Sequence, residues 1–386
     1  MISNYHYYYR LFYLCSFLIS HLISAELLGQ TQTNHPKFSK FPVIYCSDLF
    51  HPHEDPDDHF DLAVLHSIPQ IDIKGVVLDQ GDRQLKQPGG IPISQVSYLT
   101  GKKINHASGL GAKLTSPNDD GRSRPAAEQL GIEMILGILR SSKEPVTIIT
   151  VGSVRDVAAA YNREPVLFKQ NVKRVLCFIG EASNQEFSEY NVELDPNAYI
   201  CLFRSGLPIY WFPCFDGGAW QNRGHASFWQ AKHDSLLHGA SSPWIQYFIF
   251  ALEKMKTDPI QFIQSPVDVS SKKKLFDGTR NLWCTALFLI AADHAIFSND
   301  KQYSFLPFDW STSNIPSSDN PALEPLFGFE DVTITLNNQA VVHYSSNSES
   351  KNIKRFKVLK PKEYAEGMTQ ITARLISSLR SIKPIK

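Results

Sequence analysis

The chain has 386 residues, of which 43% are hydrophobic and 20% are charged, and this composition predicts one large or two modest globular domains with a substantial core. Its 38 basic and 38 acidic residues cancel, and no basic cluster is dense enough to predict a nucleic-acid-binding surface. The sequence holds no heptads, low-complexity tract or solenoid-length repeat, which excludes coiled-coil and repeat architectures.

The N-terminus has the pattern of an export signal. An apolar run of about fourteen residues, from Leu11 to Ser24, has the length of a signal-peptide core and is too short for a bilayer span. We expect cleavage after Ala25, which gives a signal peptide over residues 1–25, a polar linker over 26–40 and a secreted or periplasmic protein. An uncleaved anchor is the alternative.

The cysteines do not suggest paired bridges. Cys15 would leave with the signal peptide, and the five others, an odd number, lie in or beside apolar runs. We therefore predict buried reduced thiols rather than a disulfide framework, and no CxxC or Cys/His spacing indicates zinc. The five are Cys46, Cys177, Cys201, Cys214 and Cys284.

The first predicted strand and helix enclose the most acidic segment of the chain. A strand over residues 42–48 runs into a burst of carboxylates and then into an amphipathic helix from about His59 to Ile68. Carboxylates crowded this closely repel one another, and a bound cation is the simplest explanation. The alternative is a solvated acidic loop in which Asp57 and Asp58 cap the helix. The acidic residues are Asp48, Glu54, Asp55, Asp57, Asp58 and Asp61.

Further apolar, β-branched runs alternate with helical periodicity. This alternation indicates a doubly wound, Rossmann-like α/β fold whose mostly parallel sheet is covered on both faces. A polar segment from Gly101 to Pro125 is predicted to be a surface loop that borders the site. The predicted strands are 71–79, 145–152, 172–180 and 208–215, and the predicted helices are 93–99, 126–139, 154–161 and 195–205.

Polar or glycine residues follow each of the first four predicted strands. In a doubly wound sheet, ligands bind outside the carboxyl ends of the strands, so we expect these residues to form the rim of one crevice. They are Asp48 after the first strand, Asp79 with Gly81 and Asp82 after the second, Gly152 and Ser153 after the third, and Gly180, Glu181 and Asn184 after the fourth.

The C-terminal half carries weaker signals. For His225 and for His233, the sequence leaves two alternatives, a structural histidine or a proton donor. The apolar run from Leu282 to Ile296 predicts a buried core helix. A small extension of two strands within 332–346, a third over 355–360 and a helix over 362–380 closes the chain. No linker divides residues 41–386, which predicts a single α/β domain.

The order of these motifs resembles the inosine-uridine preferring nucleoside hydrolases. Together the matches cover most of residues 42–215 and imply a divergent member with the nucleoside hydrolase fold. The family's D-x-D-P-G-x-D-D is similar to Asp48 through Asp58, its G-I-T-T-V-A-G-N to 75–82 with Asp82 for Asn, its G-P-L-T-N to 152–156, and its A-E-F-N and D-P-E-A-A to 188–191 and 195–198.

The resemblance implies calcium-dependent hydrolysis of the N-glycosidic bond of a purine or pyrimidine ribonucleoside, or a related ribosyl compound, releasing nucleobase and ribose. It implies a homo-oligomer with a small-molecule substrate, no nucleic acid and no membrane span beyond an uncleaved signal. The implied catalytic base is Asp48, with Asp55 as the alternative. The implied metal ligands are Asp48, Asp57, Asp58 and the Arg155 carbonyl, and the implied substrate-binding residues are Asp57, Asp82, Asn184, Glu189 and Asn191.

The sequence departs from the family pattern in the opening loop and near position 284. Asp48 precedes Asp57 by nine positions rather than four, and His51 and His53 are inserted between them. Trp283-Cys284 stands where the family has a His-Asp pair that supplies a metal ligand and often an acid; Asp277, Asn281 or His233-Asp234 are the substitutes considered. A non-catalytic ribosyl- or sugar-binding protein and a hydrolase of another glycoside are therefore the alternatives.

Overall fold

The computed structural model describes residues 40–183, 188–311, 324–337, 340, 342–346 and 352–380. Asn184, the predicted signal peptide and all of the predicted linker except Lys40 lie outside this part. The described residues belong to one compact unit. A search of the described helices finds none that combines the length and the apolar character needed to cross a membrane.

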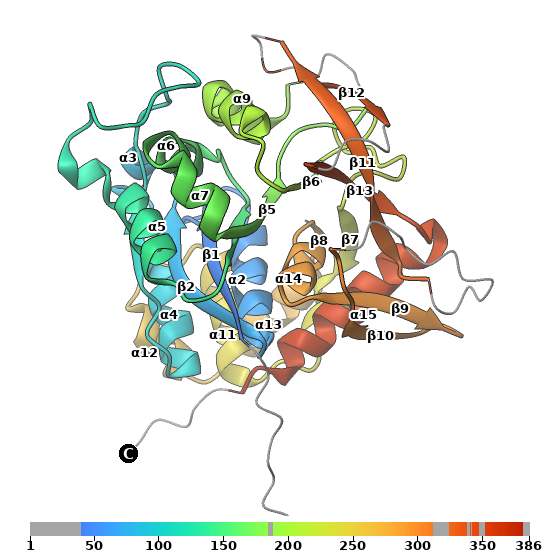
Figure 1. Ribbon diagram of the computed structural model, residues 1–386. Coiled ribbons are helices and arrows are strands. Elements are labelled where there is room, and N and C mark those ends of the chain that lie inside the picture. Colours follow the sequence, from blue (N-terminus) through green and yellow to red (C-terminus); the bar gives the residue numbers. More distant parts are fainter. Residues whose placement is uncertain are drawn as a thin grey trace, which may run out of the picture. The chain divides into compact units, whose positions relative to one another are not determined.

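A nine-stranded sheet forms the centre of the structure, as Figure 1 shows. Its order is β12-β11-β13-β6-β5-β4-β1-β2-β3, and every pair from β13 to β3 is parallel, whereas β11 pairs antiparallel with β12 and β13. The predicted α/β class with a mostly parallel sheet is thus confirmed. The strands are β1 (Phe41–Ser47), β2 (Ile71–Leu78), β3 (His106–Ser108), β4 (Val146–Thr150), β5 (Val172–Phe178), β6 (Ile209–Phe212), β11 (Phe327–Leu336), β12 (Val342–Ser346) and β13 (Ile353–Val358).

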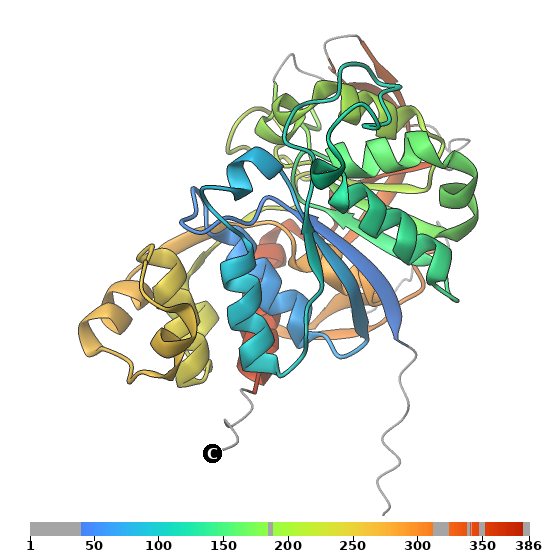
Figure 2. The same cartoon turned by 90° about the vertical axis from the view of Figure 1, so that its left-hand side faces the viewer.

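Helices cover both faces of this sheet, and Figure 2 shows the two layers on either side of the strands. One face packs against α5 (Leu130–Ser141), α6 (Arg155–Arg163), α7 (Pro165–Asn171) and α9 (Pro196–Arg204). The other face packs against α2 (Asp57–Ser67), α4 (Gly90–Thr100), α11 (Ser242–Leu252), α14 (Thr285–Ala291) and α15 (Pro361–Ser378). The shorter helices are α3 (Gly81–Gln84), η1 (Ala126–Glu128), α8 (Tyr190–Leu194), α10 (His233–Leu237), α12 (Pro259–Gln264) and α13 (Val269–Phe276).

The alternation of side chains along β1 explains why its sequence reads as an unbroken apolar run. Val43 and Tyr45 belong to the core on the α2 side, and Ile44 and Cys46 belong to the core on the α6 side. Because successive side chains of a strand point to opposite faces, a strand buried on both sides needs apolar residues at every position.

The helix predicted from Leu282 to Ile296 is wrong. The structure divides this run into β8 (Thr279–Leu282), the short helix α14 and β9 (His294–Asn299). Between α14 and β9, Asp293 has a left-handed backbone conformation with a φ of 52°. β8 pairs with β7 (Trp229–Lys232), and β9 pairs with β10 (Gln302–Pro307). An apolar run buried on all sides carries no period that separates helix from strand.

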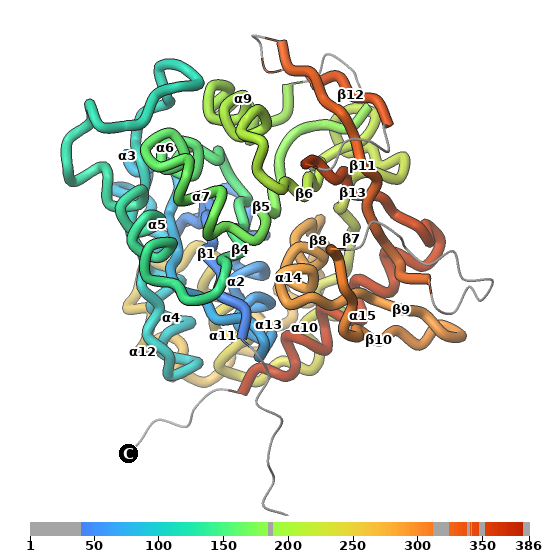
Figure 3. Tube along the Cα trace, in the orientation of Figure 1, coloured from blue at the N-terminus to red at the C-terminus, as the bar shows by residue number. Residues whose placement is uncertain are grey.

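The C-terminal segments complete the sheet and one of its covering layers. β13 pairs in parallel with β6, so the predicted extension lengthens the central sheet. α15 lies beside β9 and β10, as the tube in Figure 3 shows. The five cysteines of the described part are buried and free, as predicted, and Cys15 lies outside it.

Candidate functional site

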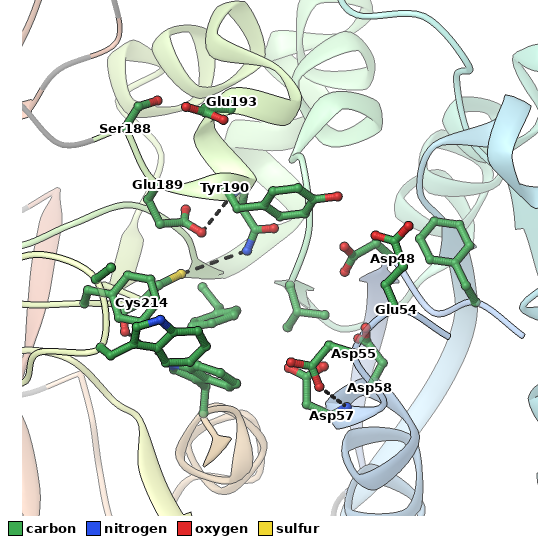
Figure 4. A pocket seen from close by; sticks show the side chains of 18 of the residues that line it. Asp48, Glu54, Asp55, Asp57, Asp58, Ser188, Glu189, Tyr190, Glu193 and Cys214 are labelled. Atoms are coloured by element: carbon green, nitrogen blue, oxygen red, sulfur yellow. Dashed lines mark hydrogen bonds between the residues drawn. The ribbon is translucent and has the colours of Figure 1, made fainter. Parts of the chain in front are cut away.

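A crevice of about 450 Å³ opens at the carboxyl ends of the strands, within the size range of small-molecule sites. One side, the acidic wall, consists of Asp48, Glu54, Asp55, Asp57 and Asp58. Figure 4 shows these carboxylates facing Glu189 and Cys214 across the crevice. The remaining lining residues are Phe50, Arg83, Val151, Phe178, Ser188, Tyr190, Asn191, Glu193, Phe215, Ala219, Trp220 and Trp283.

Two elements position the acidic wall. Asp48 follows the last residue of β1, and Asp57 and Asp58 form the first turn of α2. The hydroxyl of Ser47 donates to Asp58 Oδ1 at 2.6 Å and fixes that carboxylate at the strand end. The helix begins after Pro56 without a side-chain cap, so the predicted alternative of a capping role for Asp57 and Asp58 is not observed.

Burial and mutual repulsion perturb the three central carboxylates. Burial, followed by the charges of Asp79 and Asp57, raises the pKa of Asp48 well above its ordinary value. Burial and Asp55 raise the pKa of Asp57 to about 7, and burial, Asp48 and Asp57 raise the pKa of Asp58 well above its ordinary value. Repulsion of this kind at one site favours a cation that neutralises it.

Hydrogen bonds join the residues that follow the second and third predicted strands. Asp79 accepts hydrogen bonds from the Ser153 amide at 2.7 Å and from the Ser153 hydroxyl at 2.6 Å. Gly152 permits this approach, because a Cβ there would lie 2.7 Å from Asp79 Oδ2. Asp48 is the one predicted rim residue among the described residues that line the crevice, and Asp79 instead joins the ends of two strands through Ser153.

Two arginines flank the outer part of the acidic wall. Asp55 is exposed and accepts from Arg280 Nη1 at 2.7 Å. Glu54 pairs with Arg83 Nη2 at 2.5 Å, and the Arg83 guanidinium lies 4.1 Å from the centre of the Phe50 ring. Arg83 was not predicted from the sequence, although it directly follows the rim residue Asp82.

The inserted histidines of the opening loop turn away from the crevice. His51 stacks on Phe250 of α11 with ring centroids 4.6 Å apart, and its Nε2 lies 2.6 Å from the carbonyl of Met255. His53 lies beside His59 of α2, with ring centroids 5.8 Å apart. The extra loop length thus packs against α11 and leaves the acidic wall intact.

Glu189 and Asn191 face the acidic wall from the loop before α8. The Glu189 carboxylate accepts from the amides of Gly180 at 2.8 Å and Asn191 at 2.9 Å, so it also caps α8. The Asn191 side chain lies near the sulfur of Cys214 at 3.9 Å. Both predicted ribose-binding residues therefore line the crevice, with Glu189 held in place by backbone donors.

The remaining predicted site residues lie elsewhere. Asp82 is exposed on α3 and is not among the described residues that line the crevice. The side chain of Arg155 is buried and pairs with Asp195, so it has a structural contact, and it lines a separate void of about 10 Å³. Asp156 accepts from the Leu110 amide at 3.0 Å and is not among the described residues that line the crevice. Asn184 lies outside the described residues.

The side of the crevice opposite the acidic wall is aromatic. Phe178, Phe215, Trp220 and Trp283, here called the aromatic wall, come from the end of β5, the loop after β6 and the residues before α14. Trp283 both lies in the core and lines the crevice. The neighbouring Cys284 thiol donates to the buried Asp61.

The loop that carries Trp220 is pinned by His225. His225 Nδ1 lies 3.0 Å from Asp216 Oδ2, and its Nε2 lies 3.3 Å from Glu330 Oε1 on β11. These two carboxylates raise the pKa of His225 above its ordinary value, while Arg355, which also pairs with Glu330, opposes the rise. Neither His225 nor His233 is among the described lining residues, so the predicted proton-donor role finds no support.

The His225 contacts predict a pH dependence of stability. A raised folded-state pKa stabilises the protein fully below the unfolded value and ceases to do so as the pH rises through the folded value. Between about pH 6 and pH 9 we expect the melting temperature of the wild type to fall by about 2 °C more than that of His225→Gln. His238→Gln is the control, because His238 is 85% exposed beside an exposed Asp234. Parallel curves for wild type and His225→Gln would contradict the assignment.

The comparisons with known proteins agree with the predicted resemblance. The sequence profile described as "Inosine-uridine preferring nucleoside hydrolase" matches residues 54–216. The pyrimidine-specific ribonucleoside hydrolase RihA of Escherichia coli is 24% identical over 186 residues, and that of Salmonella schwarzengrund is 25% identical over 191 residues. Each match covers 44% of this chain and 58% of the relative, so the chain spans little more than half of the length of these enzymes.

Solved structures resemble the chain more distantly. A purine-preferring ribonucleoside hydrolase from Gardnerella vaginalis is 13% identical, with a TM-score of 0.47 over 87% of this chain and 99% of its own. An inosine-uridine preferring nucleoside hydrolase from Bacillus anthracis is 11% identical, with a TM-score of 0.47 over 88% and 99%. The type III effector XopQ, solved with adenosine diphosphate ribose, is 13% identical, with a TM-score of 0.47 over 92% and 98%.

Proposed function

We propose that this chain, a divergent relative of the inosine-uridine preferring nucleoside hydrolases, hydrolyses the N-glycosidic bond of a ribonucleoside or related ribosyl compound with the aid of a calcium ion. The observation that carries the proposal is the acidic wall, in which the half-buried Asp48 at a strand end faces Glu189 and Asn191 across a crevice of substrate size. The family match over residues 54–216 supports the same reaction class.

The donor chemistry of the acidic wall fits a hard cation. Asp48, Asp57 and Asp58 offer carboxylate oxygens, the ligands that calcium prefers; burial and then mutual repulsion raise their pKa values, and a bound cation would stabilise their ionised forms. Within the part of the chain that the structure describes, no three His, Cys, Asp or Glu side chains already converge on one point. Asp48, Asp57, Asp58 and the Arg155 carbonyl remain the proposed ligands.

The proposed reaction assigns a role to each side of the crevice. Asp48 accepts a proton from the attacking water, whose oxygen forms a bond to C1′ while the C1′–N bond breaks. Asp57 holds the ribose hydroxyls from one side, and Glu189 and Asn191 hold the ribose from the other, together with the proposed Asp82 and Asn184. When bound, calcium supplies Lewis acidity that lowers the pKa of a ligated water.

Base release with and without chelator tests the proposal. We expect the full chain with calcium to release base and reducing sugar from at least one member of a riboside panel, and excess chelator to abolish this release until calcium is restored. Asp58→Asn should weaken calcium binding at least about tenfold, measured by calorimetry, because it removes a charged oxygen donor. Asp72→Asn is the matched control, because Asp72 lies at the start of β2 and pairs with Lys74.

A non-catalytic ribosyl-binding protein is the second candidate. The observation that favours it is the pair Trp283-Cys284, which offers neither a carboxylate nor an imidazole. The same panel decides between the two. Calcium-dependent binding of ribose or ribosides without release of base from any of them would contradict the hydrolase and support the binding protein.

A further inference from the structure

The aromatic wall offers ring faces to a ligand in the crevice. Trp220 and Trp283 have ring centroids 6.2 Å apart, Phe178 lies 5.7 Å from Trp283, and Phe215 lies 5.3 Å from Trp220. The side chain of Trp220 is 57% exposed although it packs against two of these rings. A large aromatic side chain left this open at the edge of a crevice is suited to cover a flat ligand group.

The charge of the crevice is strongly one-sided. Seven carboxylates line it, the acidic wall together with Glu189 and Glu193, and Arg83 is the basic residue among the described lining residues. The guanidinium of Arg83 is already paired with Glu54 and stacked on Phe50. When these carboxylates are ionised, an excess of negative charge remains after one divalent cation binds, and such a crevice attracts cationic ligands and repels anionic ones.

The aromatic wall supplies no efficient proton donor to a leaving base. Its indole N–H at Trp283 donates to the Cys214 carbonyl at 3.2 Å, and burial raises the pKa of the Cys214 thiol well above its ordinary value. Tyr190 extends toward the acidic side in Figure 4, and partial burial raises its pKa as well. The four residues of the aromatic wall include no histidine and no carboxylic acid, and Glu189 on the same side is held as an acceptor by the amides of Gly180 and Asn191.

We propose, resting on the hydrolase function above, that the preferred substrates are ribosides whose base is a cation, as in an N-ribosylpyridinium compound. The ring faces of Trp220 and Trp283 attract such a base through the cation–π interaction, and the negative crevice draws it in. The chemistry of the leaving group completes the match. When the C1′–N bond breaks, its electron pair returns to the cationic ring nitrogen, and the base departs as a neutral molecule that needs no proton.

The test compares a cationic riboside with neutral ones. With calcium present, we expect kcat/KM for the riboside of nicotinamide to exceed that for uridine and inosine at least about tenfold. Because a pyridinium riboside is also intrinsically more reactive, binding is measured separately by calorimetry. The nicotinamide riboside should bind more tightly than its neutral 1,4-dihydropyridine analogue, which has nearly the same shape.

Variants of the aromatic wall separate this inference from the function on which it rests. Trp220→Leu should lower kcat/KM for the cationic riboside about tenfold and lower it less for uridine, since only the cation loses the electrostatic attraction of the ring. Trp283→Phe, which keeps a ring in the core, should give a smaller loss in the same direction. Leu306→Ala on β10 is the remote control.

The outcomes are distinct. Faster turnover of uridine or inosine than of the cation, or an equal loss for both in Trp220→Leu, would overturn the inference and leave the hydrolase standing. Release of base from no riboside would overturn the hydrolase, and the calorimetric comparison would then decide the inference alone. Equal affinity for the cation and its dihydropyridine analogue would overturn it.

Discussion

Replacing Asp48 by asparagine is expected to lower kcat by about 10²- to 10⁴-fold, the usual contribution of a general base. Asp48 is fixed at the end of β1, and burial with the charges of Asp79 and Asp57 raises its pKa well above the ordinary value, which makes its ionised form a stronger base. The measurement is single-turnover release of base from the best substrate in the panel, at saturating calcium.

Asp55→Asn is the discriminating variant, because the sequence allowed either aspartate to be the base. Asp55 is exposed and already pairs with Arg280, so its replacement should cost less than about tenfold. Loss of folding is excluded by thermal denaturation: the Asp48→Asn protein should be at least as stable as the wild type near neutral pH, since the raised pKa of Asp48 shows that its ionised form is disfavoured in the folded state. A larger loss in Asp55→Asn than in Asp48→Asn would reverse the assignment.

Replacing Arg155 by methionine is expected to lower the free energy of unfolding by about 3–5 kcal/mol, because it leaves a buried carboxylate without its partner. Arg155 is 3% exposed, and its Nε donates to Asp195 at 2.9 Å. The same guanidinium donates to the carbonyls of Leu110, Gly111 and Leu194, so it joins three segments of the chain.

Urea denaturation measures this loss. Arg122→Met is the matched control, because Arg122 also pairs with an aspartate but is 60% exposed, and an exposed pair contributes at most about 1 kcal/mol. Similar midpoints for Arg155→Met and Arg122→Met would show that the buried pair contributes no more than a surface one. The calcium affinity of the folded Arg155→Met protein should remain near that of the wild type, since the proposed ligand is the backbone carbonyl and the substitution changes the side chain alone.

The predictable part of the fold consists of short apolar runs that polar and turn residues bound. The buried strands β1, β2, β4 and β5 carry β-branched residues on both faces, β6 is aromatic after Ile209, and the predicted bounds of all five agree with the structure within a few residues. β3 has three residues within the polar segment from Gly101 to Pro125, and its sequence gives no strand signal. The helix predicted from Leu282 to Ile296 was wrong because uniform burial leaves no period that separates helix from strand.

The predictable part of the site is the part defined by charge. Asp48, Asp57 and Asp58 are conspicuous in sequence because carboxylates beside buried segments are costly without a purpose. The aromatic wall was missed as a ligand surface, since Trp283 and Phe215 have the composition of core residues and only the folded chain shows that one side of each faces a crevice. The ion pair between Arg83 and Glu54 joins residues of two different motifs, and no pattern in the sequence predicts it.

The placement of β1 between β4 and β2 has a consequence for how such sequences diverge. The connection after β1 leads to α2 on one face of the sheet, and the connection after β4 leads to α6 on the other face. The two connections therefore diverge, and the crevice lies between them. Asp48 directly follows the strand and Asp58 lies in the first turn of the helix, and residues 49–56 connect them. Insertions in that span can accumulate without displacing either carboxylate, so distance from the strand end, rather than spacing along the chain, identifies the equivalent residues in relatives.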